Sequence, residues 1–200
     1  MGKKTFARTL LLALAVAAPV LPPAPAGAAQ TKERARVEKI TELLAVVRDE
    51  ETLRADPNRA AEAVVRLGEM KAVEAIPDLV RLLDFRRTFD WEEVNAGGVE
   101  VVNEITLITT AKRYPAVGAL AAIGRPAVPA LLKAVGERET DSTAGENALA
   151  ALMGVFRESP SKGVKLLKKA AAAGASPLAA HRLLNAAQRA ENSLDEARKQ

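Results

Sequence analysis

The stretch AIPDLVRLL at residues 75–83 returns as AVPALLKAV at residues 127–135. Each copy follows a segment of small and apolar residues that ends in Leu67-Gly68 or in Ile123-Gly124. A unit of two helices that repeats along a chain indicates an α-solenoid, in which each unit buries its apolar face only against its neighbours. The repeat therefore favours a binding scaffold over a catalyst.

Helical periodicity supports this interpretation. Small or apolar residues recur at i, i+3, i+4 and i+7, a spacing that places them on one face of an α-helix. Prolines near the predicted helix starts lose no hydrogen bond, and Gly68 and Gly124 are predicted to end the first helices of their units. The first helices carry Ala60, Ala63, Val64 and Leu67, then Ala116, Ala119, Leu120 and Ile123, then Ala148, Ala151, Leu152 and Val155; the second carry Ile76, Leu79, Val80 and Leu83, then Val128, Leu131, Leu132 and Val135, with a weaker copy at Gly163, Leu166, Leu167 and Ala170.

These units resemble HEAT-like repeats, particularly the short bacterial type related to phycobilisome-lyase repeats. The resemblance lies in residues 59–83 and 114–135, with a degenerate third unit at 146–173. It implies an all-α fold, an α-solenoid of antiparallel helix pairs, and a role as a protein-interaction scaffold. Some members of that family attach bilin chromophores, but no motif for that activity occurs in this sequence, and we expect no cofactor.

The first 29 residues are predicted to be a secretory signal peptide. A basic segment with Lys3, Lys4 and Arg8 precedes the apolar run Leu10–Ala18, and the small residues around Ala28 and Ala29 offer a cleavage site. The run is shorter than the ~20 residues that a membrane span needs. We therefore expect export to the periplasm or the cell exterior with no transmembrane span after cleavage; an uncleaved signal anchor is the alternative.

The rest of the chain divides by composition. Residues 30–56 are predicted to be an N-terminal capping helix, 57–190 the repeat domain, and 191–200 a polar tail that frays. The spacing of the repeats leaves room for an insertion at about 85–112, which holds Phe85, Phe89, Trp91 and a run of β-branched residues. This composition favours extended structure, so the prediction here is an irregular insertion in the form of a short β-hairpin.

The charge balance argues against a nucleic-acid partner. The precursor has a formal net charge of +4, but loss of the three basic leader residues leaves 26 basic against 25 acidic side chains, a net charge of about +1. Nucleic-acid binding requires a strong, clustered basic surface. The chain has no cysteine, so no disulfide supports the fold in an oxidising compartment.

A basic row on the second helices is the main candidate for a partner-binding site. Arg81, Lys133 and Lys168 occupy the position five residues beyond the first apolar position of each second helix, and Lys165 adds charge nearby. Five residues correspond to 500° of helical rotation, so these side chains point away from the core. The row is suited to binding a protein or acidic peptide, or an anionic glycan. The competing interpretation is an ordinary solvent-exposed face.

Two further features carry weaker predictions. Trp91 is a candidate partner anchor because tryptophan is enriched at binding hot spots, but the favoured interpretation is a loop whose tryptophan packs inward. The same five-residue count on the first helices gives Val65, Ala121 and Met153, which are apolar yet predicted to face outward. Either the chain or a partner covers them, or the assumed helical register is rotated.

The sequence favours no reaction. Metal sites built from histidine and cysteine require more ligands than the single imidazole of His181. Adjacent carboxylates such as Glu50-Glu51 point apart on a helix and do not face each other across a substrate. We therefore expect a non-catalytic protein-interaction scaffold with no metal. The alternatives are an enzyme accessory or small-ligand-binding protein and a scaffold held at the membrane by its signal.

Overall fold

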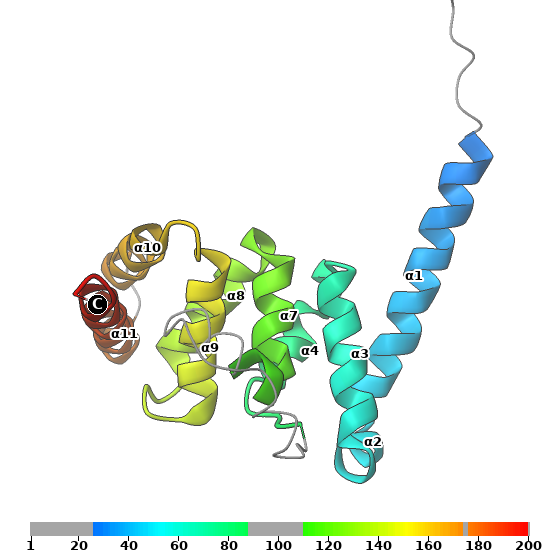
Figure 1. Cartoon of the computed structure of the whole chain (residues 1–200), viewed down its shortest axis with the longest axis horizontal. Coiled ribbons are helices and arrows are strands. Elements are labelled where there is room, and N and C mark those ends of the chain that lie inside the picture. The colour runs from blue at the N-terminus through cyan, green and yellow to red at the C-terminus, as the bar shows by residue number, and fades with distance from the viewer. Residues whose placement is uncertain (1–25, 88–109, 174–175, 200) are drawn as a thin grey trace, which may run out of the picture.

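The computed structural model describes residues 26–87, 110–173 and 176–199, and this part of the chain consists of helices joined by turns (Figure 1). The all-α prediction is therefore confirmed for the described residues. The predicted hairpin and Trp91 fall within 88–109, outside them. The α-helices are α1 (Ala26–Arg48), α2 (Glu50–Ala55), α3 (Pro57–Glu69), α4 (Ile76–Arg81), α7 (Pro115–Ile123), α8 (Val128–Glu137), α9 (Thr143–Val155), α10 (Pro160–Ala172) and α11 (Pro177–Ala197).

The helices that precede the two copies of the repeated phrase pack side by side. α3 lies against α7, and α7 lies against α9, while α4 and α8 lie behind them (Figure 1). Most of the apolar positions predicted for these helices are buried, and Leu79 and Leu131 are fully buried. The i, i+3, i+4 and i+7 spacing therefore identified the inward face of both copies correctly.

Both copies of the phrase fold in the same way. A short 3-10 turn, Val73–Ala75 in one copy and Arg125–Ala127 in the other, leads directly into α4 or α8. Pro77 and Pro129 lie in the first turn of those helices, where the absence of an N–H leaves no intrahelical hydrogen bond unmade. Local sequence thus sets the start of each helix.

Gly68 has a different role from the predicted one. It lies inside α3 and is buried, and a Cβ placed on it would lie 2.5 Å from the Cα of Ala119 on α7. Its lack of a side chain therefore permits the close approach of α3 to α7. The left-handed residue after α3 is instead Lys71, whose φ is 50°. Gly124 fulfils the prediction, because it ends α7 with a φ of 82°.

Arginine side chains bond to the C-terminal ends of α1, α4 and α8. Arg81 Nη2 donates to Val47 O at the end of α1, and Arg138 Nη2 donates to Val80 O at the end of α4, at 2.9 and 3.0 Å. Arg182 Nη1 donates to Glu137 O at the end of α8. The last carbonyls of a helix have no partner within it, so these bonds satisfy groups that the helices cannot satisfy themselves.

The third predicted helix pair is arranged differently from the first two. α10 packs mainly against α11, and α11 in turn packs against α8; α10 meets α9 over a smaller area. That smaller contact is near Gly163, where an added Cβ would lie 3.1 Å from the Sδ of Met153. The buried residues of α10 are Gly163, Val164, Leu167 and Ala171. Gly163 and Leu167 were predicted, whereas Leu166 and Ala170 are only half-buried, so the buried face is rotated toward Val164 and Ala171.

The two ends of the chain also differ from the prediction in detail. The N-terminal capping segment 30–56 consists of two helices, α1 and α2, separated at Asp49. The tail predicted to fray from residue 191 is helical to Ala197, because Leu194 packs against the core and Glu191 pairs with Lys168 on α10. The prediction missed the apolar contact of Leu194 because residues 191–200 are mostly polar.

The outward apolar residues of the first helices have mixed environments. Met153 is partly buried and packs against the core, so the chain itself covers it. Ala121 is half-buried. Val65 remains 44% exposed, as the predicted outward position requires.

The close approach at Gly68 gives a stability prediction. Gly68→Ala places a methyl group against the backbone of α7, and we expect it to lower the free energy of unfolding by about 1–3 kcal/mol although alanine is the better helix former. Chemical denaturation of the full chain measures this. Gly136→Ala is the matched control, because its Cβ would meet Ala179 at an ordinary 3.4 Å. Equal stability of the two variants would contradict the close-packing interpretation.

Candidate functional site

α1 and α3 together build a concave surface. The short helix α2 reverses the chain between them, and Arg36 Nη2 of α1 donates to Met70 O, just past the end of α3, at 3.2 Å. The two helices therefore run antiparallel, as Figure 1 shows. The C-terminal half of α1 lies against α3, while its N-terminal half extends beyond the rest of the helices (Figure 1).

A groove of about 570 Å³ lies between these two helices; we refer to it as the α1–α3 groove. Each helix contributes one face at i, i+3, i+4 and i+7, and the groove lining is mainly apolar. Leu43 and Ala63 are buried in its floor and Val46 is half-buried. The lining residues are Lys39, Glu42, Leu43, Ala45 and Val46 from α1, and Arg59, Glu62, Ala63 and Arg66 from α3.

Charged side chains form both rims of the α1–α3 groove. Lys39 pairs with Glu42 on α1, and Arg66 pairs with Glu62 on α3, each at 2.8 Å. Within the described part of the chain Arg59 is exposed and makes no ion pair, although, besides the hydrogen bond from Thr52, its charge contributes to the lowered pKa of the Asp49 carboxyl. The rims are thus largely neutralised, and the cation available to a bound molecule is Arg59.

The turn below the α1–α3 groove is fixed by capping and ion pairing. Asp49 caps α2, and its hydrogen bond from the Thr52 hydroxyl lowers the pKa of the Asp49 carboxyl, which stays ionised to more acidic pH. Arg48, at the end of α1, donates from Nε and Nη2 to the Asp78 carboxylate at the start of α4, at 3.2 and 2.9 Å. The hydrogen bond to Asp78 and the charge of that carboxylate raise the pKa of Arg48, so the guanidinium stays protonated.

The predicted basic row separates into residues with different environments. Arg81 is held by α1 and α2, because it donates to Val47 O and, at 3.0 Å, to the Glu50 carboxylate. Lys168 pairs with Glu191 of α11 at 2.7 Å. Lys133 makes a longer contact of 3.8 Å with Glu137 and its side chain is 73% exposed.

The helices that carry the row are not all neighbours. α4 and α8 pack together, so Arg81 and Lys133 lie on adjacent helices. Lys165 and Lys168 lie on α10, whereas the helix that packs against α8 on that side is α11. The structure therefore brings Arg81 close to α1, and Lys165 and Lys168 into the α10–α11 pair.

The histidine lies in a polar surface pocket. His181 is exposed on α11, with its Nε2 3.1 Å from Asn185 Nδ2. The pocket, of about 480 Å³, is formed by α11 and the turn between α8 and α9, and Arg189 in its wall donates to Thr140 O and to Glu146. Within the described residues no group of three or more histidine, aspartate or glutamate side chains is arranged to hold a metal ion.

No protein-family model, curated protein or solved structure matches this chain. In the described ranges, no single helix has the length and hydropathy to cross a membrane; Pro115–Ile123 and Arg125–Glu137 pass that test only together, and they are bent by 111°.

The α1–α3 groove is absent from the predictions made from the sequence, although a signal for it exists. The apolar residues of α1 at helical spacing are Val37, Ile40, Leu44 and Val47, of which the last three are buried and Val37 is exposed. Leu43 and Val46 form a second stripe beside them. A helix at the end of a stack needs only one apolar stripe to pack against its single neighbouring layer. The second apolar stripe on α1 could therefore have indicated the groove.

The contacts of Arg81 give a prediction about its role. Arg81→Gln removes the donor to Val47 O and the ion pair with Glu50, and we expect it to lower the free energy of unfolding by about 1–2 kcal/mol. Lys133→Gln is the control, since loss of an exposed lysine should cost less than about 0.5 kcal/mol. Urea denaturation of both full-length variants checks this. If Arg81 contributes only to partner binding and not to stability, the two variants will have the same free energy of unfolding.

Proposed function

We propose that this chain is a non-catalytic protein-interaction scaffold of the α-solenoid class, similar to HEAT-like repeat proteins, that is exported to the periplasm or the cell exterior. The observation that carries the proposal is the α1–α3 groove. Its two helical faces, mainly apolar lining and charged rims match the way in which an amphipathic helix of a partner binds between two helices.

The solenoid assignment is supported by the repeated construction. Two copies of the phrase form the same 3-10 turn and helix, and the helices that precede them pack side by side. The arginine bonds from Arg81, Arg138 and Arg182 link the ends of α1, α4 and α8 in order along the chain. Such stacking leaves the end helices with unpaired faces, which is where the groove lies.

The dimensions of the α1–α3 groove suggest the size of the bound segment. From Lys39 to Val46 and from Arg59 to Arg66 each wall spans eight residues, or about 10 Å of helix axis. This length corresponds to about two helical turns of a partner. An acidic residue next to the apolar stripe of that partner would pair with Arg59.

Cross-linking from inside the groove tests the proposal. The chain has no cysteine, so Ala45→Cys, an exposed groove position, can carry a single photo-activated cross-linker. We expect it to form discrete protein adducts in an extract of the source cells, and we expect Arg59→Glu in the same chain to weaken them. The matched control is Ala122→Cys on the exposed side of α7. The same adducts from both positions, or none from Ala45→Cys, would exclude the groove as the binding site.

A bound small molecule is the alternative for this groove. Its volume of about 570 Å³ lies within the range of ligand pockets, which are about 300–1,000 Å³. Native mass spectrometry of the purified protein distinguishes the two occupants. Additional mass of a few hundred daltons that survives purification and is displaced by Ala45→Trp would favour the ligand.

Export rests on the leader sequence and is tested separately. Expressed with its own leader in a bacterium, the chain should be recovered outside the cytoplasm with an intact mass that begins at Ala29 or Gln30. Leu12→Arg, which places a charge in the apolar run, should leave the full-length chain inside the cell. A full-length chain in the membrane fraction would instead support the uncleaved signal anchor.

A further inference from the structure

The outer face of α10 carries a row of lysines without carboxylate partners. Lys162, Lys165 and Lys169 are exposed, and the described part of the chain contains no ion pair or hydrogen bond to their ammonium groups. α10 has no acidic residue in its sequence, PSKGVKLLKKAAA. The fourth lysine, Lys168, differs from the others because it pairs with Glu191 at 2.7 Å.

Helical geometry places these three lysines on one line. The positions i, i+3 and i+7 fall within an arc of about 60° and extend over about 10 Å of the helix axis. The arc is centred about 150° from the buried side of α10, which is formed by Val164, Leu167 and Ala171. We call this row, together with the exposed Arg157 that precedes α10, the α10 basic face.

We propose that the α10 basic face docks on an anionic lipid bilayer. Phosphate headgroups attract clustered lysines on a helix without requiring a fixed geometry. The other exposed residues of this face are small, as Ser161 and Ala172 illustrate, so a flat surface can approach it closely. α10 exposes no large apolar side chain, which makes the association peripheral and electrostatic.

Composition favours a bilayer over a protein as the occupant. The central part of a protein–protein interface is depleted in lysine and contains apolar or aromatic anchors, neither of which the α10 basic face provides. Recognition of nucleic-acid phosphates more often uses arginine, whose planar group forms paired hydrogen bonds. The α10 basic face depends on point charges from three lysines.

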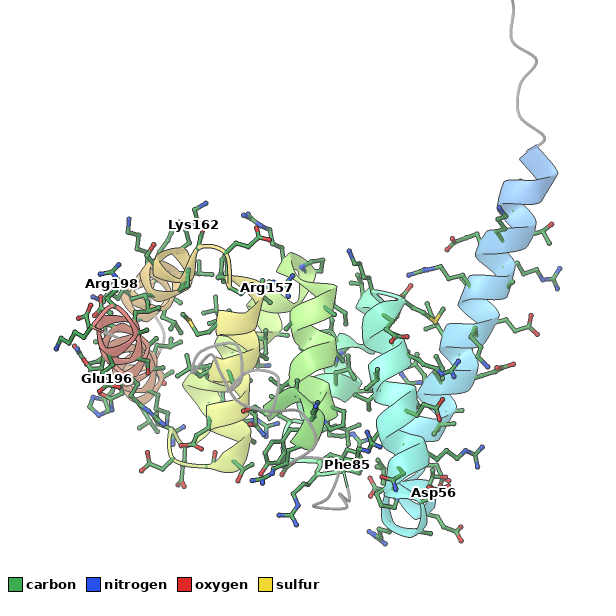
Figure 2. The ribbon with its side chains drawn as sticks, in the orientation of Figure 1. Asp56, Phe85, Arg157, Lys162, Glu196 and Arg198 are labelled. Carbon is green, nitrogen blue, oxygen red and sulfur yellow. The ribbon has the colours of Figure 1, made fainter. Side chains whose placement is uncertain are left out.

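The α10 basic face is accessible to a bilayer. Lys162 projects from α10 at the outer margin of the molecule, at the end opposite α1 (Figure 2). Lys165 and Lys169 are exposed on the same helix. This inference does not depend on the α1–α3 groove.

Vesicle binding by full-length charge variants tests the docking. The triple variant Lys162→Gln, Lys165→Gln, Lys169→Gln removes the row, and the control Lys32→Gln, Lys71→Gln, Lys133→Gln removes the same charge from other exposed positions. With vesicles of phosphatidylcholine containing roughly one third phosphatidylglycerol, we expect the triple variant to bind about 100-fold more weakly than the control. The leader is identical in both chains, so its contribution cancels in the comparison.

Salt and lipid composition complete that experiment. The difference between the two variants should disappear on vesicles of phosphatidylcholine alone and when salt is raised from about 0.1 M to about 1 M, which shortens the screening length from about 10 to about 3 Å. Equal binding of both variants to the anionic vesicles would overturn the proposal. It would also fail if the triple variant lost binding to polyglutamate or to a labelled oligonucleotide while it kept its vesicle binding.

A second measurement does not depend on charge removal. A polarity-sensitive fluorophore on Ser161→Cys lies on the α10 basic face, and the same fluorophore on Ala122→Cys lies on α7. Anionic vesicles should shift the emission of the first label and leave the second unchanged. Equal shifts at both positions would show that another surface makes the contact.

Discussion

The contact between α3 and α7 sets the geometry of the whole described structure. Gly68 and Ala119 meet where a Cβ on Gly68 would lie 2.5 Å from the backbone of α7, so the two helices are closer than larger side chains would permit. Small residues such as Ala116 and Ala148 are fully buried along the same layer. Interiors pack at near-crystalline density, so one enlarged residue here would displace the neighbouring helices as well.

Once the layer is fixed, polar groups at the helix ends determine how the second set of helices aligns with it. Arg81 and Arg138 each supply a donor to a carbonyl that the preceding helix leaves without a partner. Asn147, the buried polar residue of α9, donates to Leu83 O at 2.6 Å just beyond α4. A slip of either layer would leave these buried carbonyls unsatisfied, so the hydrogen bonds select one alignment of the helices.

The sequence was informative where one residue pattern has one structural consequence. The repeated phrase predicted α4 and α8, and its apolar positions predicted their buried faces. The prediction for Gly68 was wrong. A glycine near a helix end is compatible with a left-handed cap or with a close approach of another helix, and only the position of α7 distinguishes the two. The prediction of the basic row assumed that the second helices occupy equivalent positions. In the structure α11, not α10, packs against α8, and Arg81 donates to Val47 O of α1. The α1–α3 groove depends on how α1 and α3, which are separated in the sequence only by α2, pack against each other, and periodicity within one helix does not specify this.

The two candidate surfaces lie at opposite ends of the described helices, and the architecture explains why they differ. An end helix has no further helix to cover its outer side, so its sequence there is free to serve another purpose. At the N-terminal end, the apolar residues Leu43 and Val46 line a concave surface with paired charges on its rims. At the C-terminal end, the outer face of α10 is exposed and carries lysines that make no ion pair within the described part of the chain, together with small residues. A concave apolar surface gains binding free energy by excluding water from a complementary shape, whereas an exposed cationic face gains it through charge. The first arrangement suits a partner of defined structure and the second a fluid anionic surface, so one molecule could bind both at the same time without competition.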